Sequence, residues 1–225
     1  MKTLDTDEAL FAPLILDRCE PPIILLDVGA AIGRFTDGLR AFCGPDLNVI
    51  AHLFEPRPDA ITALRTRYSD DYLTTVNGLA VGDHKGTVPF CMLPSGEHAH
   101  VAMLNRDLDE SEEITKVVAV RMTTVDAYML QYDIPHAILK IDTEGYELAV
   151  LRGARHSLAK RRILAIQFEY GGTWATHSRL AEARDLLPNF DFYEYDRLVG
   201  LIPTVSFEDD YTRSGNYLAV LKEKE

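Results

Sequence analysis

The sequence predicts an α/β fold of the doubly wound type, in which helices cover both faces of a mostly parallel sheet. Short apolar runs rich in β-branched residues occur at 23–28 and 137–141, as in strands buried on both faces. Strand-like and helical segments alternate from residue 23 to about residue 186. Two strand-like segments then follow in succession, which predicts a C-terminal β-hairpin with an antiparallel strand.

The length of 225 residues favours one domain with a modest addition. Residues 1–22 are expected to form an N-terminal helical extension, with a short helix at 9–16 that ends before Pro21 and Pro22. Residues 23–225 form the domain itself. Hydrophobic residues make up 47% of the chain, which is enough for a packed core and argues against disorder.

In the first half of the domain, each element is bounded by a turn residue or a change of pattern. Gly29 ends the first strand, and the helix at 33–42 carries Phe35, Leu39 and Phe42 on one face. The elements that follow are a strand at 48–54, a helix at 59–68, a strand at 73–81 and, after a glycine-containing turn, a hairpin arm at 87–93.

The second half begins with a polar, irregular stretch at 94–115, which suits a loop beside a site. Thr124 or Asp126 is expected to cap a short helix that runs to residue 132. The other expected elements are strands at 117–122, 137–141, 162–168, 190–195 and 216–221, and helices at 146–158 and 179–186.

The acidic balance of the chain limits the classes of ligand. The net charge is −12 and the pI is about 5.0, so nucleic acid would be repelled at long range. The densest basic cluster, at 160–162, is expected to be the solvated end of a helix. We therefore expect a small neutral or cationic acceptor, or a sugar, and neither a nucleic acid nor a membrane partner.

The cysteines and the N-terminus predict the compartment. Cys19, Cys43 and Cys91 are odd in number and widely spaced, which indicates neither a disulfide framework nor a zinc site. Reduced thiols are typical of a cytoplasmic protein. The acidic first 20 residues resemble neither a signal peptide nor a membrane span.

The loop after the first strand is the first candidate binding element. Gly29 permits a sharp turn, and Gly33 lets a helix begin close to the strand, with free N–H groups facing a carboxylate or phosphate. A dinucleotide fingerprint would have glycine at position 31, where this chain has Ala31. The pattern fits an S-adenosylmethionine loop better, with Asp27 meeting the ammonium group of the methionine portion.

A second acid follows the next strand. Glu55 lies 26 residues after Gly29, and its carboxylate can accept two hydrogen bonds from a ribose diol. Pro56 fixes the turn that presents it.

A third set of acids follows the strand at 137–141. Asp142 and Glu144 are expected at the carboxyl edge of the sheet, near the reacting end of a bound cofactor. Two adjacent carboxylates raise the pKa of one of them, which helps it act as a base. Alternatively, Asp142 and Glu169 hold a hard cation such as Mg²⁺. Glu147 is expected to lie in the first turn of the helix that follows.

Four stretches together resemble the FkbM family of methyltransferases, over about residues 23–170: ILLDVGAAIGRF, HLFEPRPDA, NGLAVGDHKG and ILKIDTEGYELAVLRGA. The resemblance implies the Rossmann-like class I methyltransferase fold, with a seven-stranded sheet, and O-methylation of a hydroxyl on a sugar or natural product. It places Asp142 and Glu144 at the reaction centre. The residues it implies at the cofactor are Asp27, Gly29, Ala30, Gly33, Phe35, Glu55, Pro56, Ala80, Val81 and Asp142. Ala31 departs from the asparagine that the family often has.

Two other functions remain open on the sequence. One is an NAD(P)-dependent oxidoreductase, against which the missing middle glycine argues, and the other is a catalytically inactive S-adenosylmethionine-binding module. His98 and His100 are candidates for a base or metal ligands, and Trp174 for an aromatic wall around the acceptor. The site is either open or completed by a second subunit in a homo-oligomer.

Overall fold

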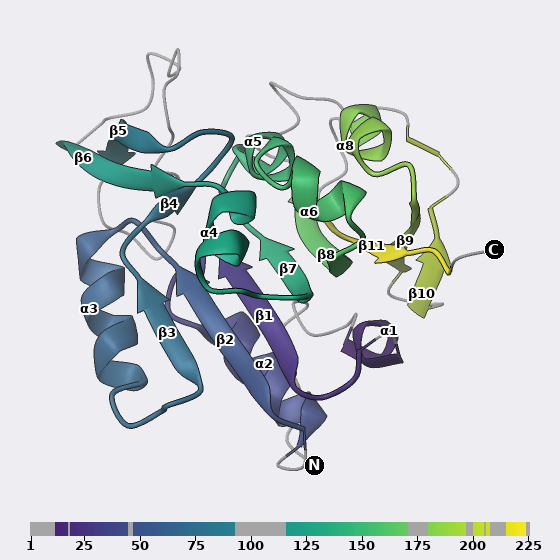
Figure 1. The fold of residues 1–225 in the computed structure, drawn as a ribbon, viewed down its shortest axis with the longest axis horizontal. Coiled ribbons are helices and arrows are strands. Elements are labelled where there is room, and N and C mark those ends of the chain that lie inside the picture. The colour runs from purple at the N-terminus through teal and green to yellow at the C-terminus, as the bar shows by residue number, and fades with distance from the viewer. Residues whose placement is uncertain are drawn as a thin grey trace.

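The computed structural model describes residues 12–17, 19–44, 47–92, 116–170, 180–196, 200–204, 206–207 and 215–223. The main sheet is built from β1 (Ile23–Val28), β2 (Val49–Phe54), β3 (Thr74–Asn77), β7 (Ala137–Ile141), β8 (Ile163–Tyr170), β9 (Phe190–Asp196), β10 (Gly200–Pro203) and β11 (Gly215–Leu221). Their order is β10-β9-β11-β8-β7-β1-β2-β3 (Figure 1). The five neighbouring strands β3, β2, β1, β7 and β8 are parallel to one another, which confirms the predicted parallel core.

Helices cover both faces of this sheet, as predicted. One face packs on α1 (Ala12–Asp17), α2 (Arg34–Cys43) and α3 (Pro58–Arg67). The other packs on α4 (Val125–Gln131), α5 (Glu147–Arg152), α6 (Arg155–Ala159) and α8 (Leu180–Leu186). Alternation along β1 explains the two cores, because Leu25 faces the first group of helices and Leu26 the second.

The number and pairing of the strands differ from the prediction. The main sheet has eight strands instead of seven, because the short β10 adds an edge that the sequence pattern did not reveal. β11 lies between β8 and β9 and pairs antiparallel with both. The two predicted C-terminal strands therefore pair, but the chain between them passes through β10, and the tight hairpin is β9–β10.

The predicted strand at 73–81 is two strands in two sheets. β3 ends at Asn77, whose side-chain amide donates to the Leu53 carbonyl and the Tyr128 hydroxyl. The chain then enters β4 (Ala80–Val81), which joins β5 (Gly86–Met92) and β6 (Lys116–Thr123) in a separate sheet of order β4-β6-β5. Figure 1 draws this small sheet near the carboxyl ends of β1, β2 and β3.

The predicted helix at 146–158 is also interrupted. A Cβ on Gly153 would lie 2.0 Å from the Gly82 carbonyl oxygen, so the chain meets the Gly82 backbone at this point. The Asp126 carboxylate then accepts hydrogen bonds from the His156 and Ser157 amides and caps α6. Thr124 caps α4 by accepting from the Ala127 amide, so both proposed caps are used, but on different helices.

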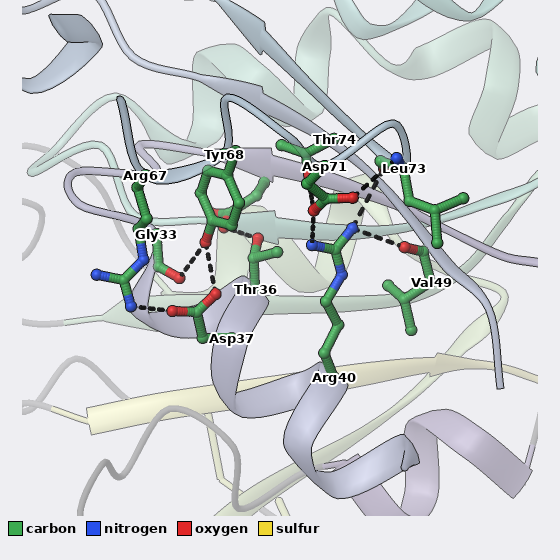
Figure 2. Close-up of polar contacts among 11 residues, drawn as sticks. Gly33, Thr36, Asp37, Arg40, Val49, Arg67, Tyr68, Asp71, Leu73 and Thr74 are labelled. Atoms are coloured by element: carbon green, nitrogen blue, oxygen red, sulfur yellow. Dashed lines mark hydrogen bonds and ion pairs between the residues drawn. The ribbon is translucent and has the colours of Figure 1, made fainter. Parts of the chain in front are cut away.

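Side chains from α3 and the following turn anchor α2 (Figure 2). The Tyr68 hydroxyl lies 3.0 Å from the Gly33 carbonyl oxygen and 2.7 Å from Asp37, which also pairs with Arg67. Arg40, in the last turn of α2, pairs with Asp71 and donates to the carbonyl groups of Val49 in β2 and of Leu73, just before β3. The contacts of Tyr68 hold the start of α2, where the glycine loop ends, and those of Arg40 hold its end.

No helix in the part of the chain that the structure describes is long and apolar enough to cross a membrane. The predicted loop at 94–115, with His98 and His100, lies outside the described residues, and so does Trp174.

Candidate functional site

The predicted site residues come together at the carboxyl ends of neighbouring parallel strands. Gly29 follows β1, Glu55 follows β2 and Asp142 follows β7, while Glu169 is the next-to-last residue of β8. In open α/β sheets, this edge is where ligands bind. The topology alone therefore brings the glycine loop and the acids to one edge.

The glycine loop lies directly against the segment that begins with Asp142. Gly29 has φ +75°, and a Cβ there would lie 1.7 Å from the Asp142 carbonyl oxygen. The Asp142 amide donates to the Val28 carbonyl over 3.0 Å. Only glycine fits this approach, so the two predicted motifs form a single structural unit.

The loop is also tied to β2, and the start of α2 remains available to an anion. The Gly29 and Ala30 amides donate to the Phe54 carbonyl, and the Ala31 amide donates to a Glu55 carboxylate oxygen. Gly33 is the N-cap of α2, and it has no side chain that could cap the helix. Its first-turn N–H groups fit a ligand carboxylate.

Glu55 is more buried than a simple ribose ligand would be. Its side chain accepts hydrogen bonds from the Ala31 and Arg57 amides, and the residue is 5% exposed. Burial raises the pKa of Glu55, although these amides and the charges of Arg57 and Lys140 oppose the rise. Each carboxylate oxygen can accept a further bond, so the contact with a ribose stays a prediction.

Asp27 is fully buried and has partners within the chain. One carboxylate oxygen accepts from the Thr36 hydroxyl over 2.7 Å, and the other lies 3.4 Å from the Lys140 ammonium. Lys140 thus supplies a cation beside the carboxylate that was predicted to meet the cofactor ammonium. Direct contact between Asp27 and a cofactor is untested.

Glu144 is an acid of the site with a strongly raised pKa. Burial is the main cause that raises the pKa of Glu144 to about 7, and the charges of Asp142, Glu169 and Glu147 add to it. Its backbone has φ +56°, a left-handed conformation that is uncommon for a residue with a side chain. Strained conformations often occur at functional sites, and a carboxyl with this pKa can exchange a proton near neutral pH.

Glu147 holds the backbone of the acidic segment through hydrogen bonds to its carboxylate. It is 2% exposed, and its carboxylate accepts from the Thr143 amide and hydroxyl and from the Gly145 amide. Burial raises the pKa of Glu147, while these hydrogen bonds favour its charged form. The residue does lie in the first helical turn, as predicted, but it also holds the turn that presents Glu144.

Replacing Glu147 by alanine should destabilise the protein by about 2 kcal/mol, because the partly buried Thr143 and Gly145 donors lose their acceptor. Urea unfolding monitored by circular dichroism measures this. The matched control is Glu182→Ala on α8, which removes an exposed pair with Arg152. Equal losses in the two variants would contradict the role given to Glu147.

Several residues predicted to contact the cofactor have side chains in the core. Ala30 and Phe35 are buried beside α2, while Val81 packs in the opposite core and Ala80 in the small sheet. Because these side chains are buried, they have little surface with which to contact a cofactor. Contacts at these positions would be made mainly by backbone groups. Pro56, half-buried, follows Glu55 as predicted.

The structure gives the predicted magnesium site no support. Within the described ranges, no three His, Cys, Asp or Glu side chains are grouped so as to hold a metal ion. Asp142 and Glu169 both lie near Glu144, whose pKa their charges raise.

Lys140 is the site residue that sequence reasoning missed. It is a buried polar residue next to Asp27, and the hydroxyl of Thr36 is the second buried partner of Asp27 in the core. A lysine inside the apolar run at 137–141 was a visible signal, and an aspartate occupies the corresponding place near the end of the run at 23–28.

Comparison with known proteins gives a family match over most of the chain. The family model described as "Methyltransferase FkbM domain" matches residues 27–195. The hexuronic acid methyltransferase AglP of Haloferax volcanii is 27% identical over 161 residues, which are 70% of this chain and 61% of that protein. The match thus spans less than two thirds of that relative.

Solved structures show the same fold at low identity. The FkbM methyltransferase of Methylobacillus flagellatus matches with a TM-score of 0.57 and 17% identity, over 94% of this chain and 47% of that one. The CurJ carbon methyltransferase matches with a TM-score of 0.51 and 8% identity, over 96% of this chain and 54% of that one. These similarities concern the Rossmann-like methyltransferase architecture.

Proposed function

Because this chain belongs to the FkbM family of methyltransferases, we propose that it transfers the methyl group of S-adenosylmethionine to a hydroxyl of a sugar or natural-product small molecule. The family match supports the methyltransferase activity. The activity, the cofactor, the oxygen acceptor and the roles of the residues are together what we propose.

The observation that carries the proposal is the contact between the glycine loop and the acidic segment. The place of a Gly29 Cβ is filled by the Asp142 carbonyl oxygen. A ligand held by the loop and the start of α2 would therefore lie next to the segment that presents Glu144. Methyl transfer needs this juxtaposition, because the acceptor must approach in line with the methyl group.

The donor groups of the loop fit the polar parts of S-adenosylmethionine. The first-turn amides of α2 suit its carboxylate, and Glu55, at the end of β2, suits its ribose hydroxyls. When bound, S-adenosylmethionine supplies a methyl group on a positively charged sulfur. The acids at the strand ends favour that charge electrostatically.

Glu144 is the proposed base. Its pKa of about 7 leaves a large ionised fraction at neutral pH and a carboxylate basic enough to accept the proton of a hydroxyl. Asp142, directly after β7, keeps Glu144 basic through its charge. Glu147 holds the turn between them through its bonds to Thr143 and Gly145.

The proposed acceptor is a sugar or another small molecule that is neutral or cationic. The relative from Haloferax volcanii, whose name describes a hexuronic acid methyltransferase, supports a sugar. The charge of −12 disfavours a nucleic acid partner.

The test is thermal unfolding of the full chain with S-adenosylmethionine, S-adenosylhomocysteine and NADH, each with and without Mg²⁺. We expect the two sulfur compounds at about 100 times their Kd to stabilise the protein by about 3 kcal/mol, a shift of several degrees. NADH should have no effect.

The outcomes separate the alternatives. A shift with NADH alone would favour the oxidoreductase. If the sulfur compounds bind, but S-adenosylmethionine is not converted to S-adenosylhomocysteine with any member of a panel of hexoses and hexuronic acids, the inactive binding module would be favoured. A shift with neither sulfur compound would reject the proposal.

A further inference from the structure

A row of buried polar residues crosses the centre of the main sheet. Asp27 of β1 is in register with Lys140 of β7, which is in register with Gln167 of β8. The three residues are 0%, 6% and 1% exposed. Residues in register on adjacent strands point to the same face, here the face that packs on α2.

The row occupies only the carboxyl half of these strands. Two residues earlier on the same face, the register positions are Leu25, Ile138 and Ala165, all fully apolar and buried. Two residues later are Gly29 and Asp142, which belong to the candidate site. The buried charges therefore begin where the loops of the site leave the sheet.

The Lys140 ammonium contacts both parts of the site. It donates to the Gly29 carbonyl over 2.8 Å and lies 3.4 Å from an Asp27 oxygen and 3.5 Å from an Asp142 oxygen. Phe35 of α2 lies beneath it, with the ring centre 6.0 Å from the ammonium nitrogen. One cation thus joins the backbone of the glycine loop to the first acid of the segment after β7.

A buried ion pair is weak evidence for stability, because well-packed apolar residues often serve a core as well. Leu25 and Ile138 lie on the same face, two residues before Asp27 and Lys140, and they show that this core accommodates apolar residues there. What an apolar side chain at position 140 would not supply is the bond to Gly29 and the attraction to Asp142.

We infer that Lys140 is a positioning residue, which holds the Gly29 carbonyl and the Asp142 carboxylate in one fixed arrangement so that the cofactor loop and the acidic segment act as a preorganised unit. The inference rests on the proposed function, because it assigns the loop to S-adenosylmethionine. The inference assigns a role to the buried charge of Lys140 in β7, which is not among the residues proposed to contact the cofactor directly.

The charge of Lys140 also reaches the proposed base. It lowers the pKa of Glu144, against the effects of burial and of the charges of Asp142, Glu169 and Glu147. Removal of the cation should therefore raise the pKa of Glu144 further. The pH range in which ionisation of Glu144 destabilises the fold should move upward with it.

The experiment compares Lys140→Met with Thr36→Val, which removes the other partner of Asp27 without removing a cation. S-adenosylhomocysteine affinity is measured by calorimetry, and stability by urea unfolding between pH 5 and 9. We expect Lys140→Met to weaken S-adenosylhomocysteine binding about tenfold to a hundredfold, as misplacement of a preorganised loop does, and Thr36→Val about threefold at most.

The pH profile gives a second readout. The midpoint of the pH-dependent loss of stability should rise in Lys140→Met and stay in place in Thr36→Val. Affinity within about twofold of the wild type in Lys140→Met, with stability alone reduced, would overturn the inference and leave a structural role only. Failure of the wild type to bind S-adenosylhomocysteine would instead reject the proposed function.

If Lys140→Met does not fold, the Asp27→Asn/Lys140→Met variant replaces it, since it leaves no unpaired aspartate charge in the core. It is compared with Asp27→Asn alone. Binding about tenfold weaker in the double variant supports the inference, and equal binding in the two overturns it.

Discussion

Replacement of Glu144 by glutamine is expected to lower kcat by about a hundredfold or more, the usual contribution of a general base. The glutamine keeps the shape of the side chain but cannot accept the proton of the acceptor hydroxyl. S-adenosylhomocysteine release with a panel of hexoses and hexuronic acids measures this. Affinity for S-adenosylhomocysteine should change by about threefold at most, since glutamine keeps the size and shape of the side chain.

The same substitution should alter the pH dependence of stability. The pKa of Glu144 is raised from 4.5 to about 7, so the native state binds this proton more tightly than the unfolded state does. The free energy of unfolding therefore falls as the pH rises from about 4.5 to 7, by up to about 3 kcal/mol from this group. In Glu144→Gln this part of the fall should disappear.

Glu182→Gln is the matched control for both measurements, because its carboxylate lies on α8 in an exposed pair with Arg152. It should leave kcat and the pH dependence unchanged. Wild-type activity of Glu144→Gln over the whole pH range would exclude Glu144 as the base.

The second large effect is expected at Gly29. In Gly29→Ala, the new methyl group would overlap the Asp142 carbonyl oxygen, 1.7 Å away, and the residue would keep a φ of +75°. We expect a loss of about 3 kcal/mol or more, from overpacking and left-handed strain together. Binding of S-adenosylhomocysteine should be lost, because the loop and the acidic segment must separate. Urea unfolding and calorimetry measure the two effects.

Gly44 provides a close control for this variant. It has φ +72°, but a Cβ there meets no atom of the described residues within 4 Å. Gly44→Ala therefore carries only the backbone strain of its φ of +72° and ψ of 178°, about 1–3 kcal/mol, and should bind S-adenosylhomocysteine normally. If the two alanine variants were equally stable and bound equally well, the close contact between Gly29 and Asp142 would have no importance.

Local patterns were sufficient to predict the parallel core. Apart from Asp27 and Lys140, the runs at 23–28 and 137–141 are apolar on both faces, and a strand covered by helices on both sides buries such a run. The glycines and acids that follow these runs must then lie at one edge, because parallel strands end together. The position of Gly29, Glu55 and Asp142 was therefore predictable without any knowledge of contacts.

The errors arose where one segment depends on another far away in the sequence. The segment that ends at Val81 has a sequence that suits a continuation of β3. Val81 nevertheless pairs with Thr123 in the small sheet. The break after Arg152 depends on the backbone at Gly82 and on the Asp126 cap. Such pairings leave no periodic trace in the sequence, because each is decided by which backbone reaches the other.

Composition, spacing and short-range pattern were enough to predict the fold class and the residues that end each central strand, and the resemblance of four motifs was enough to predict the family. The tertiary structure decided which charges meet. Lys140 and Asp27 are 113 residues apart, and only the register of β7 on β1 places the ammonium between Asp27, Gly29 and Asp142. Burial in that arrangement, more than the type of each residue, then sets the pKa of Glu144.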